Sequence, residues 1–199
     1  MFRLMLVTDN ELVGKSNLLS VISNAVKGGV DAIQIREKNM CYRELFDLTY
    51  EVKRKLGDQA RIFINGNPEI ARDLDVGLHL PSQLKLNDKF DDLIWGRSVH
   101  SVNEVVKAHE QGASYVILGT IFKTTSKPDI KGCGTNLIKQ VLSKLGGMDL
   151  IAIGGISLLN VKEVIDAGAN GVAVRQSILE SENPAETSKK FLAIINRNE

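Results

Sequence analysis

The sequence predicts a single-domain α/β protein of the (β/α)8, or TIM, barrel class, spanning residues 1–199. Short apolar runs alternate with longer amphipathic segments along the whole chain, and eight such units follow one another without a break. Unbroken alternation indicates parallel strands joined by right-handed crossovers. Eight units in 199 residues reach the lower size limit of a barrel, and no G-x-G-x-x-G follows the first strand. We therefore expect a closed barrel rather than an open doubly wound sheet.

The strands are predicted from short β-rich runs bounded by polar residues or glycine. In chain order they are RLMLVT (3–8), VDAIQIR (30–36), RIFIN (61–65), VGLHL (76–80), LIWGRS (93–98), YVILGT (115–120), LIAIG (150–154) and GVAVR (171–175).

The segments between the strands carry apolar residues at spacings of three and four, which predicts amphipathic helices. Ser101 and Ser157 stand where two of these helices should begin, so we expect them to be N-caps. Glycines stand where helices should stop, at Gly112, Gly146 and Gly168. The helices expected on these grounds cover residues 18–26, 45–52, 102–110, 137–145 and 158–167.

The composition narrows the function classes. Lys and Arg number 25 and Asp and Glu 24, for a net charge of +1, so we expect no binding to nucleic acid or to an anionic membrane. No apolar run approaches the length of a membrane span, and the first residues lack a cleavage site of a signal peptide. Cys41 and Cys133 are too few for a disulfide framework or a zinc site. We expect a cytoplasmic protein, and a homo-oligomer stays open.

The second strand raises a question about its polar face. Successive side chains of a strand point to opposite faces, so Ile33 and Ile35 share one face and Gln34, Arg36 and Lys38 share the other. The simplest interpretation is a solvated sheet face. In a barrel, however, one face meets the helices and the other meets the interior. An inward Arg and Lys are costly unless an anion neutralises them, so we expect an anion at this mouth of the barrel.

A phosphate site is expected after the seventh and eighth strands. Gly154 and Gly155 end the seventh strand, and Arg175 and Gln176 end the eighth. Glycines permit close approach of the backbone, and free amides at a helix start bind phosphate. The loops after strands seven and eight are the common phosphate site of this fold.

The connection after strand six, residues 123–134, is long and polar for a compact barrel. Its hydroxyl and ammonium groups are typical donors to anions, although a plain surface loop is the alternative. The donors are Thr124, Thr125, Ser126 and Lys127.

The chain resembles a known superfamily through five motifs in a fixed order: QIREK (34–38), GRSVHS (96–101), FKTTSK (122–127), AIGGI (152–156) and GVAV (171–174). They are similar to those of thiamine phosphate synthase and its relative TenI, a thiazole tautomerase, over essentially the full chain. The resemblance implies a small phosphorylated thiazole or pyrimidine as the ligand. It also implies a pyrophosphate- or carboxylate-binding row at Gln34, Arg36 and Lys38, substrate contacts from Asn65, Ser98, Thr124, Ser126 and Lys127, and a thiazole-phosphate loop at Gly154–Gly155.

The sequence departs from the synthase pattern at two magnesium ligands, because Gly66 and Leu84 stand where the synthase has acids. Magnesium is usually held by carboxylates and phosphate oxygens, so we expect no metal and no cofactor. Residues 64–66 and 80–82, ING and LPS, are instead the forms similar to TenI.

The TenI pattern is also interrupted. Thr120 stands where TenI has its catalytic histidine, and a threonine hydroxyl titrates far from neutrality. His100 or Lys38 is a candidate substitute acid or base. His79 also lies near a strand end, where we favour a structural role, and Gln176 replaces a small phosphate-binding serine of the family.

Three functions stay open at this point. We favour a TenI-like, metal-independent tautomerase that aromatises a thiazole phosphate carboxylate. The alternatives are thiamine phosphate synthase, which joins a pyrimidine pyrophosphate to a thiazole phosphate, and a catalytically silent binder or regulator that keeps the phosphate pocket.

Overall fold

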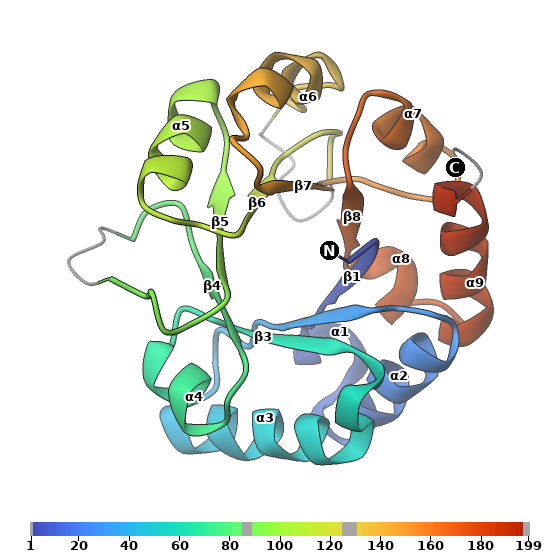
Figure 1. Ribbon diagram of the computed structural model, residues 1–199. Helices are drawn as coiled ribbons and strands as arrows, with labels where there is room; N and C mark the ends of the chain where they lie inside the picture. The colour runs from blue at the N-terminus through green and yellow to red at the C-terminus, as the bar shows by residue number, and fades with distance from the viewer. Residues whose placement is uncertain (1, 85–88, 125–130, 197–199) are drawn as a thin grey trace.

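The computed structural model describes residues 2–84, 89–124 and 131–196. Eight parallel strands form a closed barrel in chain order, with β8 pairing back to β1. Helices surround this barrel on the outside (Figure 1). The predicted (β/α)8 fold is confirmed.

All eight predicted strands are present, and their ends lie within two residues of the predicted ones. The strands are β1 Leu4–Val7, β2 Ala32–Ile35, β3 Arg61–Asn65, β4 Gly77–Leu80, β5 Trp95–Val99, β6 Tyr115–Leu118, β7 Asp149–Ile153 and β8 Gly171–Val174.

The helices are α1 Asn10–Val13, α2 Lys15–Lys27, α3 Tyr42–Leu56, α4 Pro68–Asp73, α5 Val102–Glu110, α6 Asn136–Val141, α7 Val161–Asp166, α8 Gln176–Leu179 and α9 Pro184–Ile195, with 3-10 turns η1 Gly57–Gln59 and η2 Leu142–Lys144. Helices α2, α3, α5, α6 and α7 lie on the five predicted amphipathic segments, whereas the sequence analysis does not predict α1, α4, α8 and α9.

One of the two predicted N-caps is confirmed and the other is wrong. The Ser101 hydroxyl accepts a hydrogen bond from the Glu104 amide at 3.3 Å and caps α5. Ser157 instead accepts from the Leu159 amide, in the turn before the helix. Helix α7 begins only at Val161, because the Asn160 side chain binds back to the Gly155 carbonyl and the Ser157 amide, which extends the turn.

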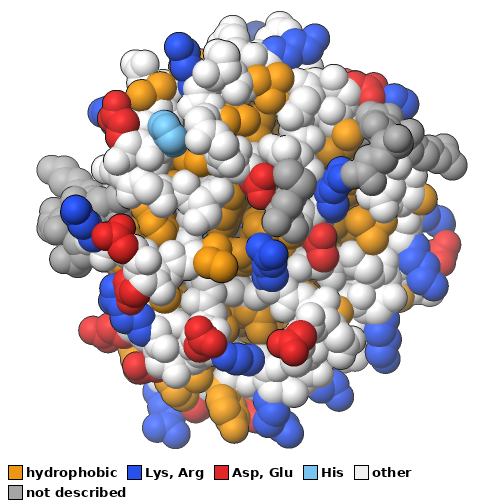
Figure 2. Space-filling model, in the orientation of Figure 1, with side chains coloured by type: hydrophobic (Ala, Val, Ile, Leu, Met, Phe, Trp, Pro, Cys, Tyr) orange, Lys and Arg blue, Asp and Glu red, His pale blue; other side chains and the backbone are white. Residues whose placement is uncertain are grey.

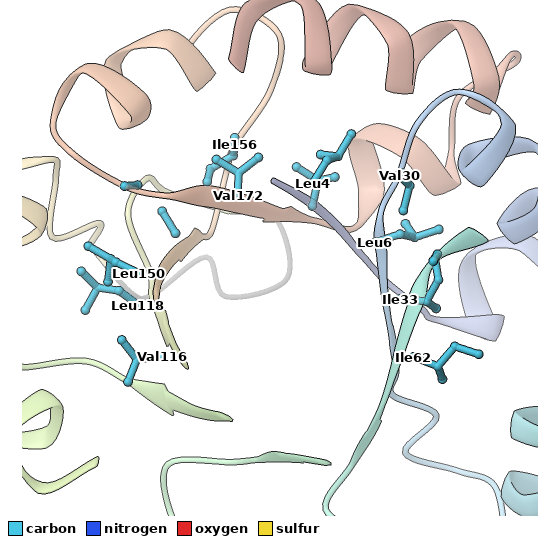
Figure 3. Close-up of a cluster of buried hydrophobic side chains, with 14 of the residues drawn as sticks. Leu4, Leu6, Val30, Ile33, Ile62, Val116, Leu118, Leu150, Ile156 and Val172 are labelled. Carbon is cyan, nitrogen blue, oxygen red and sulfur yellow. The ribbon is translucent and has the colours of Figure 1, made fainter. Parts of the chain in front are cut away.

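The apolar core has two layers, separated by the barrel wall. Outward-facing strand residues, among them Ile33 and Ile35, pack with the helices, and Figure 3 shows part of this outer layer. A smaller inner layer fills the barrel and includes Met5, Phe63 and Tyr115. The two faces of β2 are therefore both covered, as the sequence analysis expects.

Aromatic rings close the amino-terminal end of the barrel. The rings of Phe2, Phe63 and Tyr115 contact one another with centroids 5.1–5.4 Å apart. Because this end is filled by apolar side chains, the open space of the barrel lies at the carboxyl ends of the strands.

Charged side chains of both signs are interspersed over the face that Figure 2 shows. Among the described helices, none is both long enough and apolar enough to cross a membrane.

Candidate active site

A cavity of about 640 Å³ opens at the carboxyl ends of the strands. Each of the eight strands, or the loop that follows it, contributes to its wall. Every site residue that the sequence analysis names within the described part of the chain lines this cavity; Ser126 and Lys127, with Thr125, lie outside the described residues. The predicted residues in the wall are Gln34, Arg36, Lys38, Asn65, Ser98, His100, Thr120, Thr124, Gly154, Gly155, Arg175 and Gln176.

The polar row that continues from β2 provides a donor and two cations. Gln34 is 3% exposed, and its side-chain amide nitrogen has no hydrogen-bond partner within the described residues. Burial lowers the pKa of the half-buried Arg36 guanidinium, and the charge of nearby Arg175 lowers it further. Lys38 is exposed at the rim. A bound anion would stabilise the desolvated charge of Arg36 and would accept a hydrogen bond from the unpaired Gln34 amide.

The loop after β7 requires glycine at two successive positions. Gly154 and Gly155 have φ values of +109° and +62°, which L side chains rarely adopt. A Cβ atom on Gly154 would lie 2.6 Å from the Thr120 Cγ2 atom, and one on Gly155 would lie 2.9 Å from the Phe122 Cβ atom. The loop after β6 therefore packs directly against this bare backbone, and both border the cavity.

The loops after β7 and β8 are tied together. The Ser177 hydroxyl donates to the Ile156 carbonyl at 2.8 Å, which joins α8 to the glycine loop. The Arg175 guanidinium donates to the Asp9 carboxylate at 2.7 Å, so its charge is partly balanced by the residue that caps α1. The sequence analysis expects Arg175 as a phosphate ligand; the structure places it in an ion pair at the edge of the same cavity.

His100 lies beside the position of Thr120. The His100 Nδ1 atom lies 2.5 Å from the Gly119 carbonyl oxygen, and the His100 amide donates to Glu104 at 2.6 Å. A carbonyl only accepts, so Nδ1 carries a proton and donates to Gly119. The candidate substitute base thus contacts Gly119, the residue before Thr120.

A buried hydrogen-bond chain lies under the cavity. His79 on β4 is 1% exposed, with Nδ1 3.1 Å from the Tyr115 hydroxyl and Nε2 2.8 Å from the Ser98 hydroxyl. Burial, and then the charge of Arg36, lowers the pKa of His79 to about 3, so the ring is neutral. The sequence favours a structural role for His79 and does not single out Tyr115.

The described lining does not fit a magnesium ion held by carboxylates. It contains no Asp or Glu, and the described residues form no group of three potential metal ligands among His, Cys, Asp and Glu. Gly66 has no side chain to offer, and Leu84 is 41% exposed with its carbonyl bound by Arg97. The lining instead carries four basic residues: Arg36, Lys38, Lys123 and Arg175.

Sequence reasoning missed several members of the wall. Lys123 directly precedes Thr124 and Ser177 directly follows Gln176, so their position after strands six and eight is the signal that could have found them. Pro81, Ser82 and Gln83 also enter the wall, from the loop that follows β4.

Comparison with known proteins agrees with the fold of the chain. The sequence model of the family described as thiamine monophosphate synthase matches residues 4–178. A thiamine-phosphate synthase of Clostridium novyi is 32% identical, covering 97% of this chain and 98% of its own. One of Anoxybacillus flavithermus is 34% identical, covering 90% and 87%.

Among solved structures, thiamine phosphate pyrophosphorylase from Pyrococcus furiosus superimposes with a TM-score of 0.88 at 26% identity, covering 98% of this chain and 95% of that one. The 3-hexulose-6-phosphate synthase of Salmonella typhimurium, at 16% identity and a TM-score of 0.76, shares the fold alone. The relatives carry the name of the synthase, which the sequence analysis ranks second, so the narrower placement near TenI is not supported by them. The chain belongs to the thiamine monophosphate synthase family.

Proposed function

We propose that this chain catalyses the transferase reaction for which its relatives are named: it joins a pyrimidine pyrophosphate to a thiazole phosphate. The observation that carries the proposal is one cavity whose described wall holds four basic side chains and a bare glycine loop. A cavity of this character suits two phosphorylated substrates held together. Relatives 32–34% identical over nearly the whole chain support this choice of reaction.

The chemistry needs charge stabilisation more than proton transfer. The bond between the pyrimidine methylene carbon and the pyrophosphate oxygen breaks, and its electron pair leaves with pyrophosphate. The lone pair of the thiazole nitrogen then forms the new carbon–nitrogen bond. Arg36 and Lys38 face the anion that develops, and fixed cations in a partly dry site stabilise such charge strongly. The glycine loop at Gly154–Gly155 holds the thiazole phosphate through its backbone.

We assign the neutralisation of pyrophosphate to the protein's own cations, because the described wall offers no carboxylate for magnesium. The test is a coupling assay with both substrates, in which thiamine phosphate and pyrophosphate are measured as products. We expect equal amounts of the two products. Binding of both substrates without any coupling would refute the proposal.

A second candidate is the tautomerase that the sequence analysis favours, and two observations favour it. The described wall lacks the carboxylates that resemblance to the synthase implies, and the His100 imidazole lies in the wall with its Nδ1 bonded to Gly119, the residue before Thr120. A proton shift within a thiazole phosphate carboxylate needs such a group and no metal. A time course of aromatisation tests this candidate, and His100→Ala should slow it. Absence of both reactions, with phosphate binding retained, would instead indicate the silent binder.

A further inference from the structure

Three neighbouring strands place a hydrogen-bond chain on the inner wall of the barrel. His79 on β4, Ser98 on β5 and Tyr115 on β6 meet beneath the cavity, and only Ser98 of the three lines it. The distances of 3.1 Å and 2.8 Å are ordinary for hydrogen bonds. The position of each proton in this chain decides whether Ser98 donates a hydrogen bond to a ligand or accepts one.

The Tyr115 hydroxyl, at the buried end of this chain, determines which groups donate and which accept. The side chain is 2% exposed, and its ring packs against the rings of Phe2 and Phe63. Burial raises the pKa of this phenol, so it keeps its proton. Within the described residues the hydroxyl meets one partner, His79 Nδ1. A buried hydroxyl proton without an acceptor is costly, so Tyr115 donates to Nδ1.

The tautomer of the His79 ring then determines whether Ser98 accepts or donates. Because Nδ1 accepts, the neutral ring carries its proton on Nε2, and Nε2 donates to the Ser98 oxygen. In the opposite arrangement Ser98 would donate to Nε2 and Nδ1 to Tyr115, which would leave the phenol proton without an acceptor among the aromatic rings. The first arrangement leaves no buried proton without an acceptor, because the remaining Ser98 proton lies at the cavity wall.

We propose that Tyr115 and His79 are positioning residues that make Ser98 a hydrogen-bond donor toward the cavity. The Ser98 oxygen is occupied by His79, so its own proton is free for a ligand. An anionic oxygen in this basic cavity is the acceptor that such a proton suits. The inference rests on the proposed function only in supposing that a phosphorylated ligand lies against Ser98.

The first measurement needs no ligand. The chain has three histidines, so nitrogen-15 NMR of the imidazole rings gives three spin systems, and the spectrum of His79→Gln identifies those of His79. We expect His79 to be the Nε2–H tautomer. A His79 ring protonated on Nδ1 would overturn the proposal, whatever the enzyme's reaction.

The second measurement uses inorganic pyrophosphate as the probe in calorimetry. Ser98→Ala should weaken binding by about tenfold or more, as expected for loss of a charge-assisted hydrogen bond. Tyr115→Phe keeps the ring but removes the donor, and it should shift the His79 nitrogen resonances and weaken binding by roughly threefold to tenfold. Tyr50→Phe makes the same chemical change on the exposed face of α3 and should alter neither quantity.

Two variants of His79 separate positioning from packing. Glutamine can place an amide donor near the Nε2 position, whereas asparagine is too short to reach Ser98. His79→Gln should therefore bind pyrophosphate more tightly than His79→Asn. Equal affinities for these two, or an unchanged affinity in Tyr115→Phe, would overturn the proposal. If the unmodified protein did not bind pyrophosphate, the proposed function would fail, while the tautomer of His79 would still decide the direction of the chain.

Discussion

Gly155→Asp should abolish binding of thiazole phosphate while the barrel stays folded. Gly155 has a φ of +62°, and a Cβ there would lie 2.9 Å from the Phe122 Cβ atom. A left-handed conformation costs a non-glycine residue roughly 1–2 kcal/mol. The added carboxylate would also stand against the phosphate. At ~5 Å and an effective dielectric constant of about 20, each pair of unit charges repels by about 3 kcal/mol, or about 6 kcal/mol for a dianion.

Calorimetry with thiazole phosphate measures the effect, and the thermal unfolding curve reports the fold. Gly112→Asp is a matched control, because Gly112 has a φ of +85°, nothing within 4 Å of an added Cβ, and no place in the cavity wall. The control should bind normally, and it should lose less stability than Gly155→Asp because its added Cβ meets no neighbour. Normal thiazole phosphate affinity in folded Gly155→Asp would refute the assignment of this loop as the phosphate cradle.

Three further predictions concern the same cavity. Arg36→Ala should weaken the binding of a ligand that bears both pyrophosphate and an organic group by about tenfold to a hundredfold, because ~1.5–3 kcal/mol of charge-assisted hydrogen bonding is lost. The binding of thiazole phosphate should barely change. Equal losses of affinity for the two ligands would contradict separate anion sites. Excess EDTA should leave the coupling rate nearly unchanged, since the described wall has no carboxylate for a metal. A coupling rate that collapses with EDTA and returns with magnesium would show that residues outside the described part supply ligands. Thr120→His should raise aromatisation of a dihydrothiazole phosphate carboxylate by about 10²–10⁴-fold if the second candidate function is right; unaltered aromatisation with normal ligand binding would remove it.

The fold could be predicted because the hydrophobic pattern alone sets it. Each strand is a short apolar run, and five of the connections carry the helical period. The error at Ser157 arises because a serine before an apolar segment satisfies the local cap rule, while the choice between Ser157 and Asn160 depends on the Gly155 carbonyl that Asn160 binds. That contact depends on the conformation of the loop, which the sequence pattern does not indicate.

The site could be predicted in part, for a reason of topology. In a barrel all carboxyl strand ends meet at one mouth, so polar residues after strands two, seven and eight are brought together by the fold itself. The partnership of Arg175 with Asp9 and that of His79 with Tyr115 could not be predicted, because each depends on the register between strands distant in sequence. The two sources of information on the reaction point in different directions. The missing acids weigh against the synthase reaction, whereas the similarity to the synthases extends over nearly the whole chain.

The most direct test of the central claim is the coupling reaction itself, run with the unmodified protein and with Arg36→Ala under the same conditions. The measured quantity is the amount of thiamine phosphate formed against the amount of pyrophosphate released. The account predicts a one-to-one ratio for the unmodified protein and a markedly lower rate for Arg36→Ala, because the guanidinium stabilises the leaving group. Calorimetric binding of both substrates with no thiamine phosphate formed, or equal rates for the two proteins, would contradict it.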